Sequence, residues 1–208
     1  ILSHPIASVV GMAMTADHPD LAGDDSQGSD TVTALERAFG VSGVVAEIAV
    51  EGLAETLEQM VHAELGDAVV AMGQLRSQVQ ALESLVVARF DQSMEWSADG
   101  YRSPAAAIKD MTGTAKAAAG RKVAVARKLD SMPHTLAAWR AGMIDLCHVD
   151  RLCRANRPKW AAAFREVEPL LVDNAMRMQY MDFAKTVARF EELAAEGDTD
   201  DDDDSGGH

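Results

Sequence analysis

The spacing of apolar residues after Asp67 is the feature that most constrains how this chain can fold. Asp is a common helix-capping residue, and the apolar residues that follow it are separated by alternating steps of four and three residues. This spacing is typical of coiled coils and helical hairpins. After Ala68, the apolar stripe consists of Met72, Leu75, Val79, Leu82 and Val86. We predict a long helix that ends near Trp96 and packs this stripe on its own domain or on a second subunit.

Turn residues divide the rest of the chain into short helices. Ser, Thr and Asp are favoured as N-caps, Pro in the first turn, and Gly just after the last turn. Pro133 is expected to break the chain again. Further helical stretches are expected at 159–165, 168–176 and 179–195. The main predicted helices are 104–111 capped by Ser103, 115–129 capped by Thr114, 135–141 ended by Gly142, and one capped by Asp145 that ends before Asn156.

Composition agrees with a helical chain. No segment alternates apolar and polar residues as a half-buried strand would, and aromatic residues make up only 5% of the chain. Ala, the best helix former, accounts for 36 of the 208 residues. The predicted fold class is therefore all-α, with a long helix or helical hairpin followed by a bundle of short helices.

The length of 208 residues predicts one domain with flanking segments. Residues 1–32 contain five Asp and no Lys or Arg, and we predict a disordered acidic segment there. A single helical domain is predicted over 33–196, divided into 33–96 with the long helix, a basic middle over 97–166, and C-terminal helices over 167–196. The tail 197–208 includes Asp200–Asp204, and it is predicted to be disordered because adjacent carboxylates repel one another.

Cysteine content and hydropathy indicate the cellular compartment in which the protein is expected. Two Cys exclude a disulfide framework, and no apolar run approaches the ~18 residues of a membrane helix. No basic residue precedes the mildly apolar Ile6–Ala16, as a secretory signal peptide would require. We therefore expect a cytoplasmic protein with no membrane partner.

Charge is distributed unevenly along the chain. The net charge is −14, from 19 Lys and Arg against 33 Asp and Glu. Residues 101–165, however, contain 13 of the basic residues and four acidic ones, a local charge of +9. Such segregation is typical of a surface that binds a polyanion, but it also arises when the polar faces of a helical domain happen to be basic. A further possibility is that the acidic tail covers the basic middle.

Two pairs of short helices joined by Gly-containing turns resemble helix-turn-helix units. In the first pair, the basic residues of 115–129 share the arc opposite its apolar side chains, except Lys122, which falls within the apolar arc. The candidate nucleic-acid contacts are Lys116, Arg121, Arg127 and Lys128 in the first unit and Arg140, Arg151 and Arg154 in the second. Helical hairpins are also how ordinary bundles are built, so both interpretations stay open here.

Catalytic and metal-binding patterns are poorly represented. Cys147, His148 and Cys153 lack the paired spacing and the fourth ligand that a zinc site needs. The sequence contains no Gly-rich phosphate loop, nucleophile elbow or paired-His zinc motif. We predict no catalytic residue, no metal ligand and no cofactor in this chain.

An ordered series of motifs over about 67–195 resembles the 13E12-repeat family, the helical domain of unknown function 222 found in actinobacteria ahead of HNH endonuclease domains. The motifs are Leu82–Asp91, Trp96–Pro104, Thr112-Gly113, Arg121–Leu129, Met132-Pro133, Leu136–Gly142 and Ile144–Asp150. The resemblance implies a helical module that accompanies a DNA-cutting domain, to which any divalent metal would belong. The His-rich nuclease motif is absent here, which predicts a truncated member or fragment whose own enzymatic activity is undetermined.

Two hypotheses follow from the sequence. The leading one is a non-catalytic, DNA-associated helical module of an HNH-endonuclease-type family. The alternative is a helical protein-interaction or dimerisation scaffold that binds no nucleic acid and forms a homodimer through the long helix.

Overall fold

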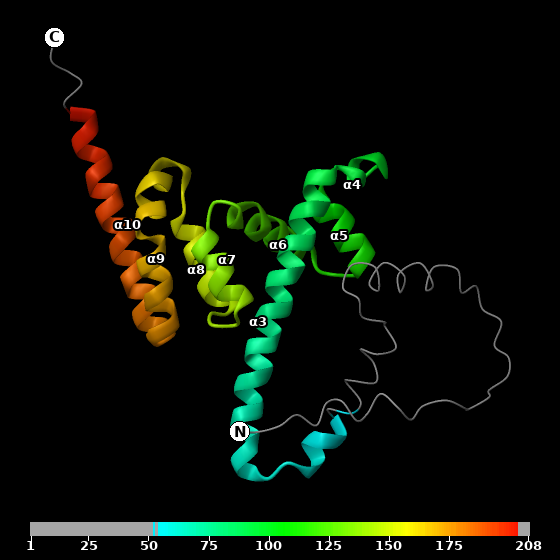
Figure 1. The fold of residues 1–208 in the computed structure, drawn as a ribbon. Helices are drawn as coiled ribbons and strands as arrows, with labels where there is room; N and C mark the ends of the chain where they lie inside the picture. Colours follow the sequence, from blue (N-terminus) through cyan, green and yellow to red (C-terminus); the bar gives the residue numbers. More distant parts are fainter. Residues whose placement is uncertain (1–51, 53, 204–208) are drawn as a thin grey trace. The chain divides into compact units, whose positions relative to one another are not determined.

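The computed structural model describes residue 52 and residues 54–203, and every regular element within them is helical (Figure 1). The all-α prediction is confirmed for this part of the chain. The chain divides into two compact units, 1–61 and 62–208. Within the first, a helix is described over 54–59. The disorder predicted for 1–32 and for the end of the tail beyond Asp203 lies outside the described residues.

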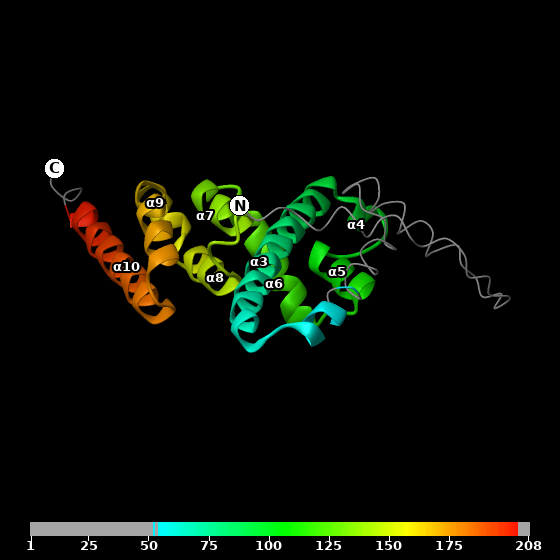
Figure 2. The same cartoon turned by 60° about the horizontal axis from the view of Figure 1, so that its bottom comes forward.

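The second unit contains the basic middle of the sequence. Its elements, in chain order, are α3 His62–Ser93, α4 Glu95–Ala98, α5 Pro104–Thr112, α6 Lys116–Leu129, α7 Pro133–Arg140, α8 Leu146–Ala155, a 3₁₀ turn η2 Pro158–Trp160, α9 Ala161–Arg177 and α10 Tyr180–Asp203. Both views place α4 and α5 on one side of α3, and α7 to α10 on the other (Figures 1 and 2). None of the described helices is both long and apolar enough to cross a membrane.

The long helix predicted after Asp67 is α3, but it begins earlier and ends before Trp96. Met94 has a positive φ of 58° and separates α3 from α4. The Ser93 hydroxyl accepts a hydrogen bond from the Glu95 amide at 3.3 Å, which offers this backbone an alternative to continuing the helix. The Trp96 indole donates to the Asp91 carbonyl at the end of α3. Trp96 was expected to lie within the helix, but its side chain instead provides a hydrogen-bond donor for a carbonyl at the C-terminus of α3.

The predicted start of α5 and the stop after it are confirmed. Ser103 accepts a hydrogen bond from the Ala106 amide at 3.2 Å, and Pro104 is the first helical residue. Gly113 follows with a φ of 65°, in the left-handed region that favours glycine. The predicted cap at Thr114 is wrong, since α6 begins after Ala115 with no side-chain cap and the Thr114 hydroxyl pairs instead with that of Thr112.

The next two helices show one revised and one confirmed boundary. Pro133 does not simply interrupt the chain but is the first residue of α7. Proline is tolerated there because an N–H group at the first helical position would have no acceptor within the helix, so its absence costs nothing. Asp145 caps α8 as predicted, and its carboxylate accepts hydrogen bonds from the Cys147 and His148 amides.

The C-terminal helices are longer than predicted. Helix α9 continues through Pro169, where two separate stretches were expected, because Phe164 on one side and Leu171 on the other are both held in the core. Helix α10 extends to Asp203, beyond the boundary expected at 196. Phe183 and Val187 anchor its first turns, and extending an anchored helix is easier than nucleating one.

Two clusters of buried side chains hold the second unit together. The larger joins α6 to α10, with Ala81 of α3, and includes the fully buried Met132, Trp139, Phe164 and Phe183. The smaller joins α3, α5 and α6 and includes Val87, Ile108, Ala119, Val123 and Ala126. Helix α6 contributes to both clusters, since Val125 and Leu129 belong to the larger one. Helix α3 also reaches the larger cluster through Ala81 and packs on α7, so α6 and α3 together connect the two clusters.

Candidate functional site

The seven basic residues predicted to contact nucleic acid do not act as one free surface. Lys116, Arg140 and Arg154 are exposed and form no ion pair among the described residues. The other four bind groups of the protein itself, and they are Arg121, Arg127, Lys128 and Arg151.

Arg127 connects α6 to α3 through a bidentate pair with Asp91. Its Nε lies 2.5 Å from one carboxylate oxygen and its terminal nitrogen 2.9 Å from the other. The hydrogen bonds from Arg127 hold the pKa of the Asp91 carboxyl below its usual value. Lys122, which falls in the apolar arc of α6, also reaches α3 and forms an ion pair with Glu83. Two of the basic side chains of α6 are therefore used to dock it on the long helix.

Arg151 connects α8 to α10 in a similar way. Its two terminal nitrogens lie 3.0 and 2.7 Å from the carboxylate oxygens of Glu191, and both side chains are mostly buried. The hydrogen bonds from Arg151 lower the pKa of the Glu191 carboxyl from its usual value. Because this guanidinium is committed to Glu191, it is unsuited to contacting a phosphate.

Lys128 helps to cap the C-terminus of α8. Its ammonium donates hydrogen bonds to the carbonyls of Cys153 and Asn156, the latter at 2.9 Å. These carbonyls lie at the end of α8, where backbone acceptors have no helical partner and the helix dipole favours a positive charge. The charge of Lys128 thus stabilises the packing of α6 on α8.

A hollow of about 190 Å³ between α6 and α8 brings three of the predicted residues together. It is lined by Arg121, Lys128 and Arg154, with the Asp150 carboxylate and the Cys153 side of α8 among the remaining walls. Arg121 lies 3.7 Å from Asp150, and its side chain remains 61% exposed. Lys116, Arg127, Arg140 and Arg151 do not line this hollow, so the predicted set is divided among several places.

Cys147, His148 and Cys153 have local structural roles. The His148 Nδ1 accepts a hydrogen bond from the Asp145 amide at 3.5 Å, which completes the capping box of α8, and it also lies 2.7 Å from the Asp145 carboxylate. Its ring also packs against Tyr180 and Phe183 of α10. Cys153 is buried, and desolvation raises the pKa of its thiol to about 12, whereas Cys147 is exposed. Within 54–203, no cluster of three or more His, Cys, Asp or Glu side chains is placed to hold a metal ion.

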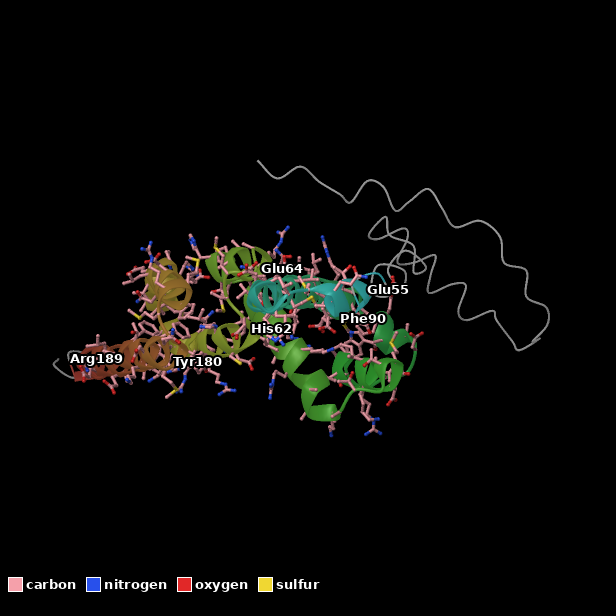
Figure 3. All side chains as sticks on the ribbon, turned by 90° about the horizontal axis from the view of Figure 1, so that it is seen from below. Glu55, His62, Glu64, Phe90, Tyr180 and Arg189 are labelled. Carbon is pink, nitrogen blue, oxygen red and sulfur yellow. The ribbon has the colours of Figure 1, made fainter. Side chains whose placement is uncertain are left out.

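The apolar stripe of α3 does not lie in the core of the second unit. Its five side chains, Met72, Leu75, Val79, Leu82 and Val86, are between 42% and 56% exposed. Leu65 and Val69 extend the exposed apolar surface toward the start of the helix. Figure 3 labels His62 and Glu64 in this first turn. The large apolar residues of the stripe therefore face away from the bundle, whereas Val87 is buried within it.

The opposite face of α3 is the one that packs on α6 and α7, and sequence reasoning missed it. Along most of its length it consists of small residues, with Ser77, Ala81 and Ser84 buried, and Val87 is buried near its end. The spacing of the small residues, by four and three, repeats that of the stripe, half a turn away on the helix. Small side chains permit close approach of neighbouring helices. The row of small residues was therefore a signal in the sequence, but the row of larger apolar residues drew the prediction to the other face.

A buried carboxylate was also missed. Glu168 of α9 is 1% exposed, and its Oε1 accepts hydrogen bonds from both the amide and the hydroxyl of Thr135 at 2.8 Å. Thr135 lies in the first turn of α7, whose N-cap residue Met132 offers no side-chain acceptor. A carboxylate from another helix therefore caps α7, which the order of residues along one helix does not reveal.

A family model supports the resemblance noted in the sequence. The model for a domain of unknown function (DUF222) matches residues 67–206, which include most of α3 and all the helices that follow it. No curated protein and no solved structure matches the chain. Since the matched region covers well over half of the sequence, the chain belongs to the DUF222 family.

Proposed function

We propose that this chain is a non-catalytic helical assembly module that self-associates through the apolar stripe of α3. The observation that carries the proposal is the exposure of Met72, Leu75, Val79, Leu82 and Val86 in one continuous row. Monomeric soluble proteins rarely expose a large contiguous apolar surface, and where such a surface occurs it marks an interaction site. The alternating spacing of the row is the pattern by which one helix packs against another.

The opposite face of α3 supports the same conclusion. The helix already has a packed side formed by Ser77, Ala81 and Ser84, so the stripe is not needed to hold α3 on its bundle. Burial of apolar area is the main favourable contribution to packing. A single copy of the chain that buries the small side chains of α3 and exposes the large ones to water therefore forgoes much of this contribution. A partner helix on the stripe removes this imbalance.

We expect Val79→Glu to raise the dissociation constant of self-association at least ~100-fold. In a two-fold dimer the substitution places two carboxylates in the apolar seam, and burying an unpaired charge is strongly unfavourable. Sedimentation equilibrium over a range of concentrations measures the effect. Val70→Glu is the matched control, because Val70 is exposed on the same helix but lies outside the stripe. A native chain that stays monomeric at every concentration contradicts the proposal.

A second candidate function is contact with a polyanion such as DNA at the hollow between α6 and α8. Arg121 and Arg154 line this hollow beside Lys128, in the segment of the sequence with a charge of +9. The resemblance to modules that precede HNH endonuclease domains favours DNA as the polyanion. Arg121 pairs with Asp150, and Lys128 is held by backbone carbonyls. Among the described residues only Arg154 of the three has neither kind of partner, so we expect weak binding that depends on few phosphate contacts.

Salt dependence tests this second candidate. The affinity for duplex DNA is expected to fall as salt rises, and Arg154→Gln is expected to weaken binding and to lower the slope of log affinity against log salt by about 1. Arg189→Gln is the control, because that exposed arginine lies on α10 (Figure 3) and does not line the hollow. Equal effects of the two substitutions, or an affinity that salt leaves unchanged, exclude a specific contact at the hollow.

A further inference from the structure

We infer that the partner on the stripe is a second copy of this chain whose α3 runs antiparallel to the first, with Val79 of each copy packed against Leu82 of the other. This inference rests on the proposed self-association and adds its orientation and register. It is carried by the charged residues that flank the stripe, Arg76, Glu83 and Arg89, all of which are exposed on α3.

Arg89 opposes a parallel pairing. It follows Leu75 and Leu82 at intervals of seven residues, so it occupies the next position of the stripe. In a parallel, in-register pair each residue faces its own copy, and two Arg89 guanidinium groups would meet across the apolar seam. In the antiparallel register Arg89 lies beside Met72 of the other copy, near the end of the seam, where its long side chain can reach water.

Arg76 and Glu83 favour the antiparallel pairing directly. They lie seven residues apart along one edge of the stripe, and Arg76 forms no ion pair among the described residues. When Val79 faces Leu82 of the second copy, Arg76 of each chain lies beside Glu83 of the other, and the two-fold symmetry makes this pair twice. In a parallel register these edge positions would face the uncharged Ala71 and Gln78.

Glu83 can serve both its own bundle and the second copy. Lys122 of α6 binds its Oε1, and the Glu83 side chain remains 45% exposed. The second carboxylate oxygen is therefore available to Arg76 of the other chain. The bundle-facing side of α3, with Ser77, Ala81 and Ser84, points away from the stripe, so the two bundles lie on the outer sides of the helix pair.

Cysteine cross-linking tests the orientation. V79C and L82C are placed separately in a Cys147→Ser background, since Cys147 is exposed and Cys153 is buried. The two full-length variants are mixed in equal amounts, and glutathione disulfide is added to form disulfides between them. The cross-linked products are identified by mass spectrometry. Disulfides need Cα atoms about 4.4–6.8 Å apart, so facing positions are the ones that link. We expect the V79C–L82C product to exceed either homodisulfide at least tenfold.

The possible failures are distinguishable by sedimentation of the same variants under reducing conditions. A predominant V79C homodisulfide from a dimer shows a parallel pairing and overturns the inference. Dimers that form neither the mixed disulfide nor a homodisulfide overturn the register but leave the proposed self-association intact. A chain that sediments as a monomer overturns both, and in that case another part of the same chain is the occupant of the stripe.

Discussion

Replacing Glu168 by Ala is expected to lower the free energy of unfolding by roughly 3–5 kcal/mol. The substitution leaves the amide and the hydroxyl of Thr135 without an acceptor in a buried environment, and each unsatisfied donor costs about 1–3 kcal/mol. The first residue of α7 is Pro133, and its N-cap residue Met132 provides no side-chain acceptor, so no neighbouring residue of α7 replaces the lost carboxylate. The loss is measured by urea denaturation as a lower midpoint at unchanged slope.

Two further variants separate the capping role from other effects at this position. Glu166→Ala removes an exposed carboxylate from the same helix and is expected to change stability by less than about 0.5 kcal/mol. Glu168→Gln keeps an acceptor for Thr135 and is expected to lose less than half as much as Glu168→Ala. If Glu168→Ala were as mild as Glu166→Ala, Glu168 would not be the cap of α7.

Replacing Gly142 by Ala is expected to cost roughly 2–4 kcal/mol, for two reasons that add. Gly142 has a φ of 73°, and a residue with a Cβ is disfavoured in that region by about 1–2 kcal/mol. A Cβ there would also lie 3.0 Å from the backbone carbonyl oxygen of Gln74 and 3.2 Å from the Gln74 Cβ. Because the nearest atom belongs to the backbone of α3, the helix itself would have to move.

Two other glycines provide matched controls for Gly142, and urea denaturation compares all three variants. Gly113 has a φ of 65° but open space around its Cβ position, so Gly113→Ala should show the backbone penalty alone. Gly120 lies within α6, with an ordinary helical φ and open space, and Gly120→Ala is expected to stabilise the chain by about 0.5–1 kcal/mol. A cost at Gly142 no larger than that at Gly113 would contradict the close approach of α3 to the turn after α7.

The Gly142 contact also bears on the proposed assembly surface. Gln74 lies between Met72 and Leu75, so the residue that approaches Gly142 is flanked in the sequence by two members of the stripe. Since side chains of a helix diverge around its axis, fixing one side of α3 against the turn directs the other side outward. The close packing of a glycine and small residues on the inner face is therefore what leaves the large apolar residues available to a partner.

Local capping signals predicted many of the helix boundaries. Ser103, Gly113 and Asp145 each act through hydrogen bonds or backbone angles within a few residues of themselves, and all three are confirmed. Some predictions failed for local reasons, as at Thr114, whose hydroxyl pairs with that of Thr112, and others failed where a distant group intervened. Helix α9 continues through Pro169 because residues on both sides are anchored in the core, which local rules for proline do not register.

The sequence by itself determined the helical class, several of the places where helices begin and end, and membership of the family, because these depend on the order of neighbouring residues. Only the tertiary structure decided which face of α3 is buried and which cations are neutralised. Periodicity shows that Met72 and Val79 share a face but not what lies opposite them. Likewise, a count of charges cannot show that Arg127 and Arg151 bind carboxylates 36 and 40 residues away, and such pairings exist only once the chain has folded.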